Sequence, residues 1–198
     1  MDSGVCVPVQ HRRVGSDGDR GVFEISYKPL DVSDHNQYML FLGLFYDFHL
    51  EVNEDDLSEI IDWPLKNGTT TRTTKCEAMF DHMSDYGGKV QLVYDREDLI
   101  GFLLYHSIFD CMIVIRCMYT TSKYYDAGLG KGLINSLPIE VRRVIFQTRR
   151  TKPPEQMLKV TDKYRSKVCE SDELITWEMP WGVNHGRRTS SRSCRTGS

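Results

Sequence analysis

The residues best suited to chemistry in this 198-residue chain lie in one glycine-rich stretch, 119–137. An apolar run typical of a strand, 111–118, precedes it, and Gly128, Gly130 and Gly132 then alternate before an apolar helical pattern. Glycine permits positive φ and lets a ligand approach the backbone closely. The free N–H groups and the positive dipole end of the helix favour a phosphate there. Two interpretations fit: a phosphate-binding loop, or a tight strand-to-helix connection whose glycines serve only the turn.

The cysteines and the apolar runs limit the other kinds of site. The six cysteines include no C-x-x-C pair and no metal-ligand spacing with histidine. We therefore expect no metal site and a reducing, cytoplasmic compartment. The amino terminus lacks the apolar region of a signal peptide. The longest apolar run, 38–46, is too short to span a bilayer, so no membrane partner is expected.

Composition divides the chain into three regions. Hydrophobic residues make up 40% and charged residues 27%, as in ordinary globular proteins. Residues 1–20 are rich in Gly, Ser, Asp and Arg and are expected to form a flexible arm. Residues 21–182 are expected to form one domain, and residues 183–198 a basic Arg/Ser-rich tail.

The first half of the domain is expected to be mainly helical. A strand over 22–27 precedes a helix that starts near residue 34 and is capped by Asp31 or Ser33. A second helix is expected over 56–63, with acidic residues at its start and Pro64 at its end. A polar loop over 67–74 leads to a third helix over 76–86.

The second half is expected to be mainly sheet. An antiparallel meander is predicted from three strands, over 89–94, 99–107 and 111–118. A short helix follows the glycines and stops near Leu137, because Pro138 cannot continue it. The strand over 141–148 comes after that helix, so it should pair in parallel with 111–118. A helix from Pro153-Pro154 to Tyr164 and a last strand over 174–179 complete the prediction.

This order of elements resembles the GNAT superfamily of acyl-CoA-dependent N-acyltransferases. In that family, Arg/Gln-x-x-Gly-x-Gly/Ala opens the helix after the central strand. Here Tyr125-Asp126-Ala127-Gly128-Leu129-Gly130 stands at that position, after a strand that ends near Met118-Tyr119-Thr120. Leu99-Ile-Gly-Phe102 also resembles the start of the family's preceding strand. The resemblance implies an α/β (α+β) fold: a mixed, mostly antiparallel sheet with a V-shaped split between two central parallel strands, flanked by helices.

The resemblance also implies a ligand and a reaction. Acetyl-CoA would lie in the split, with its pyrophosphate on the N–H groups of residues 125–130 and its pantetheine arm paired with the edge of 118–120. A primary amine of a small molecule or protein would attack the thioester directly, which needs a base and an acid. The implied ligand-binding residues are Met118, Tyr119, Thr120, Tyr125, Asp126, Ala127, Gly128, Leu129, Gly130 and Lys131.

Several residues depart from the family pattern. Tyr125 stands where the family has Arg or Gln, and Asp126 places an anion beside two phosphates. Tyr164 is the nearest substitute for the family's tyrosine acid, although packing of its helix against the sheet would also explain it. Asp110 is a candidate base, with Glu97 and His106 as further options.

These departures leave two functions open. The first is an N-acetyltransferase. The second is a catalytically degenerate protein of the same fold, held through its terminal arms in a larger assembly such as a virion. The arginines of the tail would allow a weak contact with nucleic acid; they are Arg187, Arg188, Arg192 and Arg195.

Overall fold

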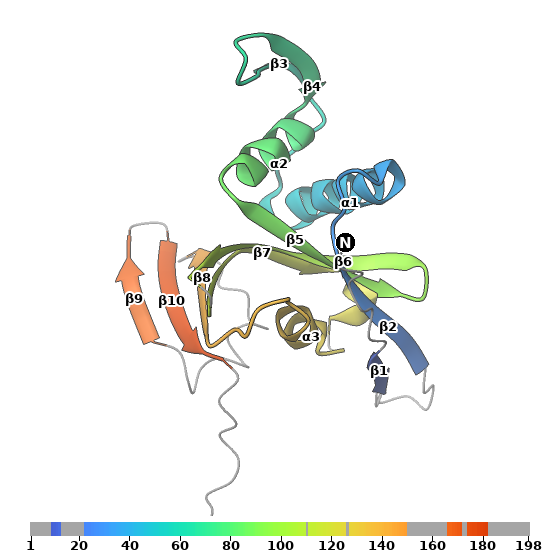
Figure 1. Ribbon diagram of the computed structural model, residues 1–198, viewed down its shortest axis with the longest axis vertical. Helices are drawn as coiled ribbons and strands as arrows, with labels where there is room; N and C mark the ends of the chain where they lie inside the picture. Colours follow the sequence, from blue (N-terminus) through green and yellow to red (C-terminus); the bar gives the residue numbers. More distant parts are fainter. Residues whose placement is uncertain are drawn as a thin grey trace, which may run out of the picture.

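The computed structural model describes residues 9–12, 22–109, 111–125, 127–149, 166–171 and 174–181. These residues form an eight-stranded sheet of order β1-β2-β5-β6-β7-β8-β10-β9 and a separate hairpin, β3-β4 (Figure 1). The strands are β1 (Val9–Arg12), β2 (Val22–Pro29), β3 (Ile60–Pro64), β4 (Thr70–Thr74), β5 (Gly88–Asp95), β6 (Asp98–Ile108), β7 (Met112–Thr120), β8 (Arg143–Arg149), β9 (Ser166–Glu170) and β10 (Leu174–Pro180). The helical segments are α1 (His35–Phe48), the π-helix η1 (His49–Asn53), α2 (Lys75–Asp85), the 3-10 turn η2 (Ser122–Tyr124) and α3 (Leu129–Asn135).

Helices cover both faces of the large sheet. α1 and α2 lie on one face and α3 on the other (Figure 1). A hydrophobic core lies on each face of the sheet. Strand β6 contributes side chains to both, because successive side chains of a strand point to opposite faces. Phe102 and Leu104 are buried with α1 and α2, whereas Leu103 and Tyr105 are buried with α3. The sheet is therefore the middle layer of three.

Strand β7 changes face part-way along, because a bulge interrupts its pairing with β6. The extra residue is Arg116, between the paired residues Ile115 and Cys117. One inserted residue reverses the alternation of side chains. Ile113 and Ile115 are buried with α3, whereas Cys117 and Tyr119 pack on the α1 side. The bulge thus places Tyr119 on the opposite face from the glycine-rich helix.

The same bulge marks the end of the parallel pairing in the sheet. β7 and β8 pair in parallel from Met112–Arg143 to Ile115–Phe146. Within the described residues, 116–120 of β7 make no ladder pair with β8, although β6 still pairs with the other edge of this segment. The expected mixed sheet, with its split between two central parallel strands, is confirmed.

Most of the expected strands are present within one or two residues of their predicted ends. The meander β5-β6-β7, the short helix α3, the parallel strand β8 and the last strand β10 all appear in the predicted order. The first strand and the helix over 76–86 are also found, as β2 and α2. The helix expected over 154–164 lies outside the described residues.

The helix expected over 56–63 is wrong. Residues 60–64 form β3, which pairs with β4 from Ile60–Thr74 to Pro64–Thr70. The local sequence explains this, because Ile60-Ile61 and the run of threonines opposite are β-branched and favour strands. Acidic residues are common at helix starts, and here they precede the hairpin instead. The hairpin projects beyond α2, away from the large sheet (Figure 1).

The cap expected for α1 also differs. Asp34 is the N-cap, and its side chain accepts from the backbone N–H groups of Asn36 and Gln37. Asp31 instead closes the preceding turn by accepting from the N–H of Ser33 at 2.9 Å. The sequence analysis did not predict β9 or β1. β1 lies inside the segment expected to be an arm and pairs with β2.

Two helical glycines make a matched test of this packing. A Cβ on Gly132 would lie 1.8 Å from Tyr27 Oη, whereas a Cβ on Gly43 would meet nothing within 4 Å. We predict that Gly132→Ala lowers the free energy of unfolding by about 1–3 kcal/mol, because Tyr27 or α3 must move. Gly43→Ala should raise it by about 0.5–1 kcal/mol through helix propensity. Urea unfolding followed by circular dichroism measures both, and a Gly132→Ala variant as stable as the wild type would contradict this packing.

Candidate functional site

The connection from β7 to α3 brings most of the predicted site residues together. Met118, Tyr119 and Thr120 are the last residues of β7, and Leu129 begins α3. The other predicted residues of the connection that the structure describes are Tyr125, Ala127, Gly128, Gly130 and Lys131. The predicted residues Asp110, Asp126 and Tyr164, and the four tail arginines, lie outside the described residues.

Gly128 sets the conformation of the loop. It is the N-cap of α3 and has a φ of 71°, in the left-handed region that favours glycine. A Cβ there would meet nothing within 4 Å, so the space beyond this residue is open. Among the described residues, no side chain accepts a capping hydrogen bond at the start of α3. The first N–H groups of α3 therefore keep their capacity to donate to an anion.

Packing fixes this helix end against the sheet. Leu129 and Leu133 are buried, and Tyr124, just before the loop, donates from its Oη to Asp95 Oδ2 at 2.8 Å. Gly130 lies against Met118: an added Cβ would be 3.0 Å from the Met118 terminal methyl group. The open stretch of β7 and the uncapped start of α3 are thus held as neighbours, as a ligand that uses both requires.

A carboxylate from a distant part of the chain joins this site. Glu51 lies in η1, directly after α1, and accepts a 2.5 Å hydrogen bond from Tyr119 Oη. Its other oxygen accepts from Tyr125 Oη. These hydrogen bonds, that of Tyr119 first, lower the pKa of Glu51 below its ordinary value of 4.5. Glu51 is therefore ionised at neutral pH and links the helical segment after α1 to the end of β7 and to the loop that precedes α3.

The pKa values of the two tyrosine hydroxyls shift in the opposite direction, upward. Burial, followed by the hydrogen bond to Glu51, raises the pKa of Tyr119. The hydrogen bond to Glu51, followed by burial, raises the pKa of Tyr125 to about 12. Both hydroxyls therefore stay protonated at neutral pH and remain donors. The sequence analysis missed Glu51 because nothing in a run of surface acids distinguishes the one that reaches two tyrosines.

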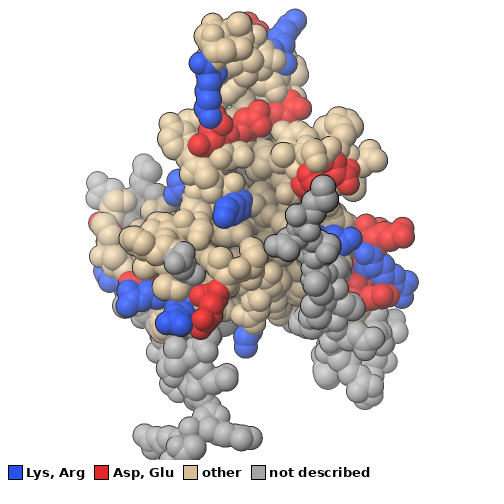
Figure 2. All heavy atoms as spheres, in the orientation of Figure 1, with Lys and Arg blue, Asp and Glu red and all other residues tan. Residues whose placement is uncertain are grey.

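The chain around Glu51 is strongly acidic. Residues 29–65 contain nine Asp or Glu and no Lys or Arg. In Figure 2, basic side chains flank the hairpin, and acidic side chains lie where it meets the rest of the molecule. Near the glycine loop, Lys123 Nζ lies 5.0 Å from the ring centroid of Tyr124, and Lys131 is exposed. The segment that carries Glu51 is therefore acidic, whereas Lys123 lies in η2 before the glycine loop and Lys131 lies on α3.

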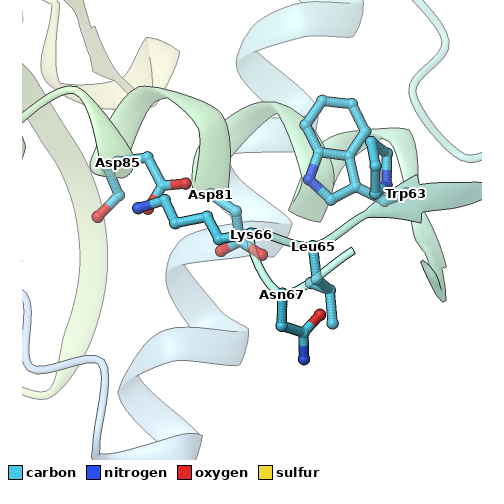
Figure 3. A pocket seen from close by; sticks show the side chains of 8 residues that line it. Trp63, Leu65, Lys66, Asn67, Asp81 and Asp85 are labelled. Carbon is cyan, nitrogen blue, oxygen red and sulfur yellow. The ribbon is translucent and has the colours of Figure 1, made fainter. Parts of the chain in front are cut away.

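A hollow lies between the β3-β4 hairpin and α2, away from this site (Figure 3). It encloses about 420 Å³ and is lined by Trp63, Pro64, Leu65, Lys66, Asn67, Asp81, Ser84 and Asp85. Lys66 Nζ contacts Asp85 Oδ1 at 2.6 Å. This exposed ion pair occupies one side of the hollow.

In the described part of the chain, no three His, Cys, Asp or Glu side chains are placed to hold a metal ion. None of the described helices is long and apolar enough to cross a membrane.

Comparison with known proteins rests on structure alone. No protein-family model and no curated protein sequence matches the chain. Among solved structures, an acetyltransferase from Thermus thermophilus is 14% identical with a TM-score of 0.51, and covers 79% of this chain and 96% of its own. The chain has the fold of the GNAT acetyltransferases. The PaiA N-acetyltransferase from Thermoplasma acidophilum, solved with coenzyme A, gives 10% identity, a TM-score of 0.51 and coverages of 79% and 99%.

A third GNAT-fold structure gives the same match. Ard1 from Thermoplasma volcanium is 9% identical, with a TM-score of 0.50, and covers 79% of this chain and 97% of its own. The chain thus spans nearly the full length of each of these proteins. At identities this low, the structural likeness shows the GNAT fold alone.

The hydrogen bonds to Glu51 predict a pH-dependent contribution to stability. Because the folded-state pKa is lowered, the contribution is present above the unfolded pKa near 4.5 and is lost as pH falls through the folded value. Glu51→Gln should lower the free energy of unfolding by about 1 kcal/mol or less at pH 7, since the site is exposed, and by almost nothing at pH 3. Urea unfolding at both pH values measures this.

The matched control is Glu97→Gln, which makes the same charge change in the exposed turn between β5 and β6. This substitution should change the free energy of unfolding little at either pH. If Glu51→Gln lowers the free energy of unfolding by the same amount at pH 7 and pH 3, the ionised carboxylate does not make these hydrogen bonds.

Proposed function

We propose that this protein is an N-acetyltransferase that moves the acetyl group of acetyl-CoA to a primary amine. One observation carries the proposal: the segment of β7 that is unpaired with β8 lies beside the start of α3, where no described side chain forms a cap. An extended ligand arm that ends in phosphates needs both features side by side. The GNAT fold supports the proposal.

The described residues fit the parts of acetyl-CoA. The N–H groups at the start of α3, with Gly128 open to solvent, would hold the pyrophosphate. The edge of 118–120 would pair with the amides of the pantetheine arm as an added strand. When bound, acetyl-CoA supplies the acetyl group as a thioester, and the acceptor amine displaces the thiolate.

Two residues outside the described part of the chain complete the proposal. Asp110 is proposed as the base that removes a proton from the amine, and Tyr164 as the acid that protonates the leaving thiolate.

Tyr125 stands at the position of the family's Arg or Gln, and its hydroxyl donates to Glu51. It therefore brings no positive charge to the pyrophosphate, so attraction depends on backbone N–H groups, on the dipole of α3 and on the lysines near the loop, Lys123 and Lys131.

This departure supports a second candidate, a protein of GNAT fold that has lost catalysis and serves in an assembly. Asp126 adds an anion to the same loop. The two candidates differ in whether acetyl-CoA binds at all, so a binding measurement separates them.

We predict that acetyl-CoA binds and that Gly128→Glu weakens binding at least about tenfold, because a carboxylate and a strained backbone would enter the phosphate loop. Isothermal titration calorimetry measures the Kd. Gly68→Glu is the matched control: Gly68 also has positive φ, 83°, and lies in the distant hairpin turn. It should leave the Kd unchanged. No binding at millimolar acetyl-CoA would contradict the enzyme proposal and favour the assembly protein.

A further inference from the structure

We infer that Glu51 binds a positive charge of the acceptor, so that the preferred acceptor is an amine that carries at least one further cationic group. The inference rests on the proposed function and specifies its second substrate. It depends on the cluster of Glu51, Tyr119 and Tyr125, which links η1, β7 and the glycine loop.

The position of Glu51 follows from the bulge in β7. Because the bulge turns Tyr119 to the α1 side, the carboxylate that Tyr119 holds lies across the sheet from α3. Tyr125 reaches the same carboxylate from the loop that follows β7. Glu51 therefore stands beside the open segment of β7, on the face opposite the proposed phosphate site. An acceptor that reaches the thioester from this face would pass Glu51.

The chemistry of the cluster suits a cation. Both donors to Glu51 are neutral phenols, so these bonds orient the carboxylate without cancelling its charge. A carboxylate has about four lone-pair sites, and the two phenols use two of them. Glu51 is itself exposed, so the remaining sites can accept from an ammonium group.

Acidic residues near Glu51 also favour the binding of a cation. Asp47, on the same helical segment, adds to the negative potential that raises the pKa of Tyr119. Residues 29–65, which hold both acids, have no Lys or Arg of their own. Lys75 does reach Glu59 from α2, so part of the acidity is neutralised at the hairpin. Beside the cluster itself, Asp47 and Glu51 are two acids on one helical segment, and like charges close together attract a cation.

The same facts argue against Glu51 as the general base. An efficient base has a pKa near the working pH, whereas the phenols lower that of Glu51. A carboxylate stabilised in its charged form binds a cation well and takes up a proton poorly. Glu51 is therefore a binding residue that positions the acceptor.

Two amines of equal length test the inference. Coenzyme A is first titrated into the full chain, and the saturated complex is then titrated with 1,5-diaminopentane and with n-pentylamine. The diamine should bind more tightly on the order of tenfold, the difference that a charged hydrogen bond typically makes. Glu51→Gln should remove this preference, so that the two amines bind with similar affinity. Glu97→Gln, with the same charge change, should keep the preference.

The outcomes distinguish failure of the proposed function from failure of the inference about Glu51. If coenzyme A does not bind, the proposed function fails and the inference with it. If coenzyme A binds and the wild type takes both amines equally, only the inference is overturned, and this comparison needs no variant to fold. A Glu51→Gln protein that loses coenzyme A binding would also overturn it, by assigning Glu51 to the cofactor side.

A third ligand identifies the source of the charge. A dilysine peptide with blocked termini presents the same two ammonium groups on a polypeptide. Tighter binding of this peptide than of the diamine would assign a basic polypeptide as acceptor, and tighter binding of the diamine would assign a free polyamine. Either result requires that Glu51→Gln weakens the tighter ligand.

Discussion

One inserted residue in β7 determines the geometry on which the site depends. Arg116 bulges out of the pairing with β6, and the parallel pairing with β8 ends at the residue before it. A bulge bends a strand and increases its twist, so two strands that begin as neighbours separate beyond it. The open edge of 118–120 and the turn of Tyr119 toward α1 are both consequences of this residue. Without it, β7 would be an ordinary central strand with neither edge available.

In the proposed function, the two faces of the sheet would bind different partners of the reaction. On one face, buried Leu129 and Leu133 hold the uncapped start of α3 beside β7, where backbone N–H groups suit phosphates. On the other, Glu51 and the acidic segment 29–65 suit a cation. The hydroxyl of Tyr125 joins the two sides by donating to Glu51. A tyrosine at the position of the family's Arg or Gln thus has a structural partner, which explains how the loop is fixed without that cation.

The sequence predicted the second half of the domain well, because local signals there agree with the fold. Alternating apolar residues, the Asp95–Asp98 turn and Pro138 each specify one element, and the parallel crossover follows from a strand–helix–strand order. The helix over 56–63 was mispredicted because acids typical of a helix start precede β-branched residues, and pairing with the threonines of β4 decided the outcome. The glycine loop could be located from its spacing. Glu51 could not, because its role comes from tyrosines far along the chain that only the folded sheet brings to it.

The central claim is that the open edge of β7 and the start of α3 form one ligand site. Amide hydrogen exchange with and without acetyl-CoA tests this most directly, because it reports on the backbone groups themselves. The account predicts slower exchange at 118–120 and 127–131 when acetyl-CoA is present, with no change in the hairpin of 60–74. Exchange that stays unchanged across 118–131 at saturating acetyl-CoA, or protection confined to the hairpin, would contradict it.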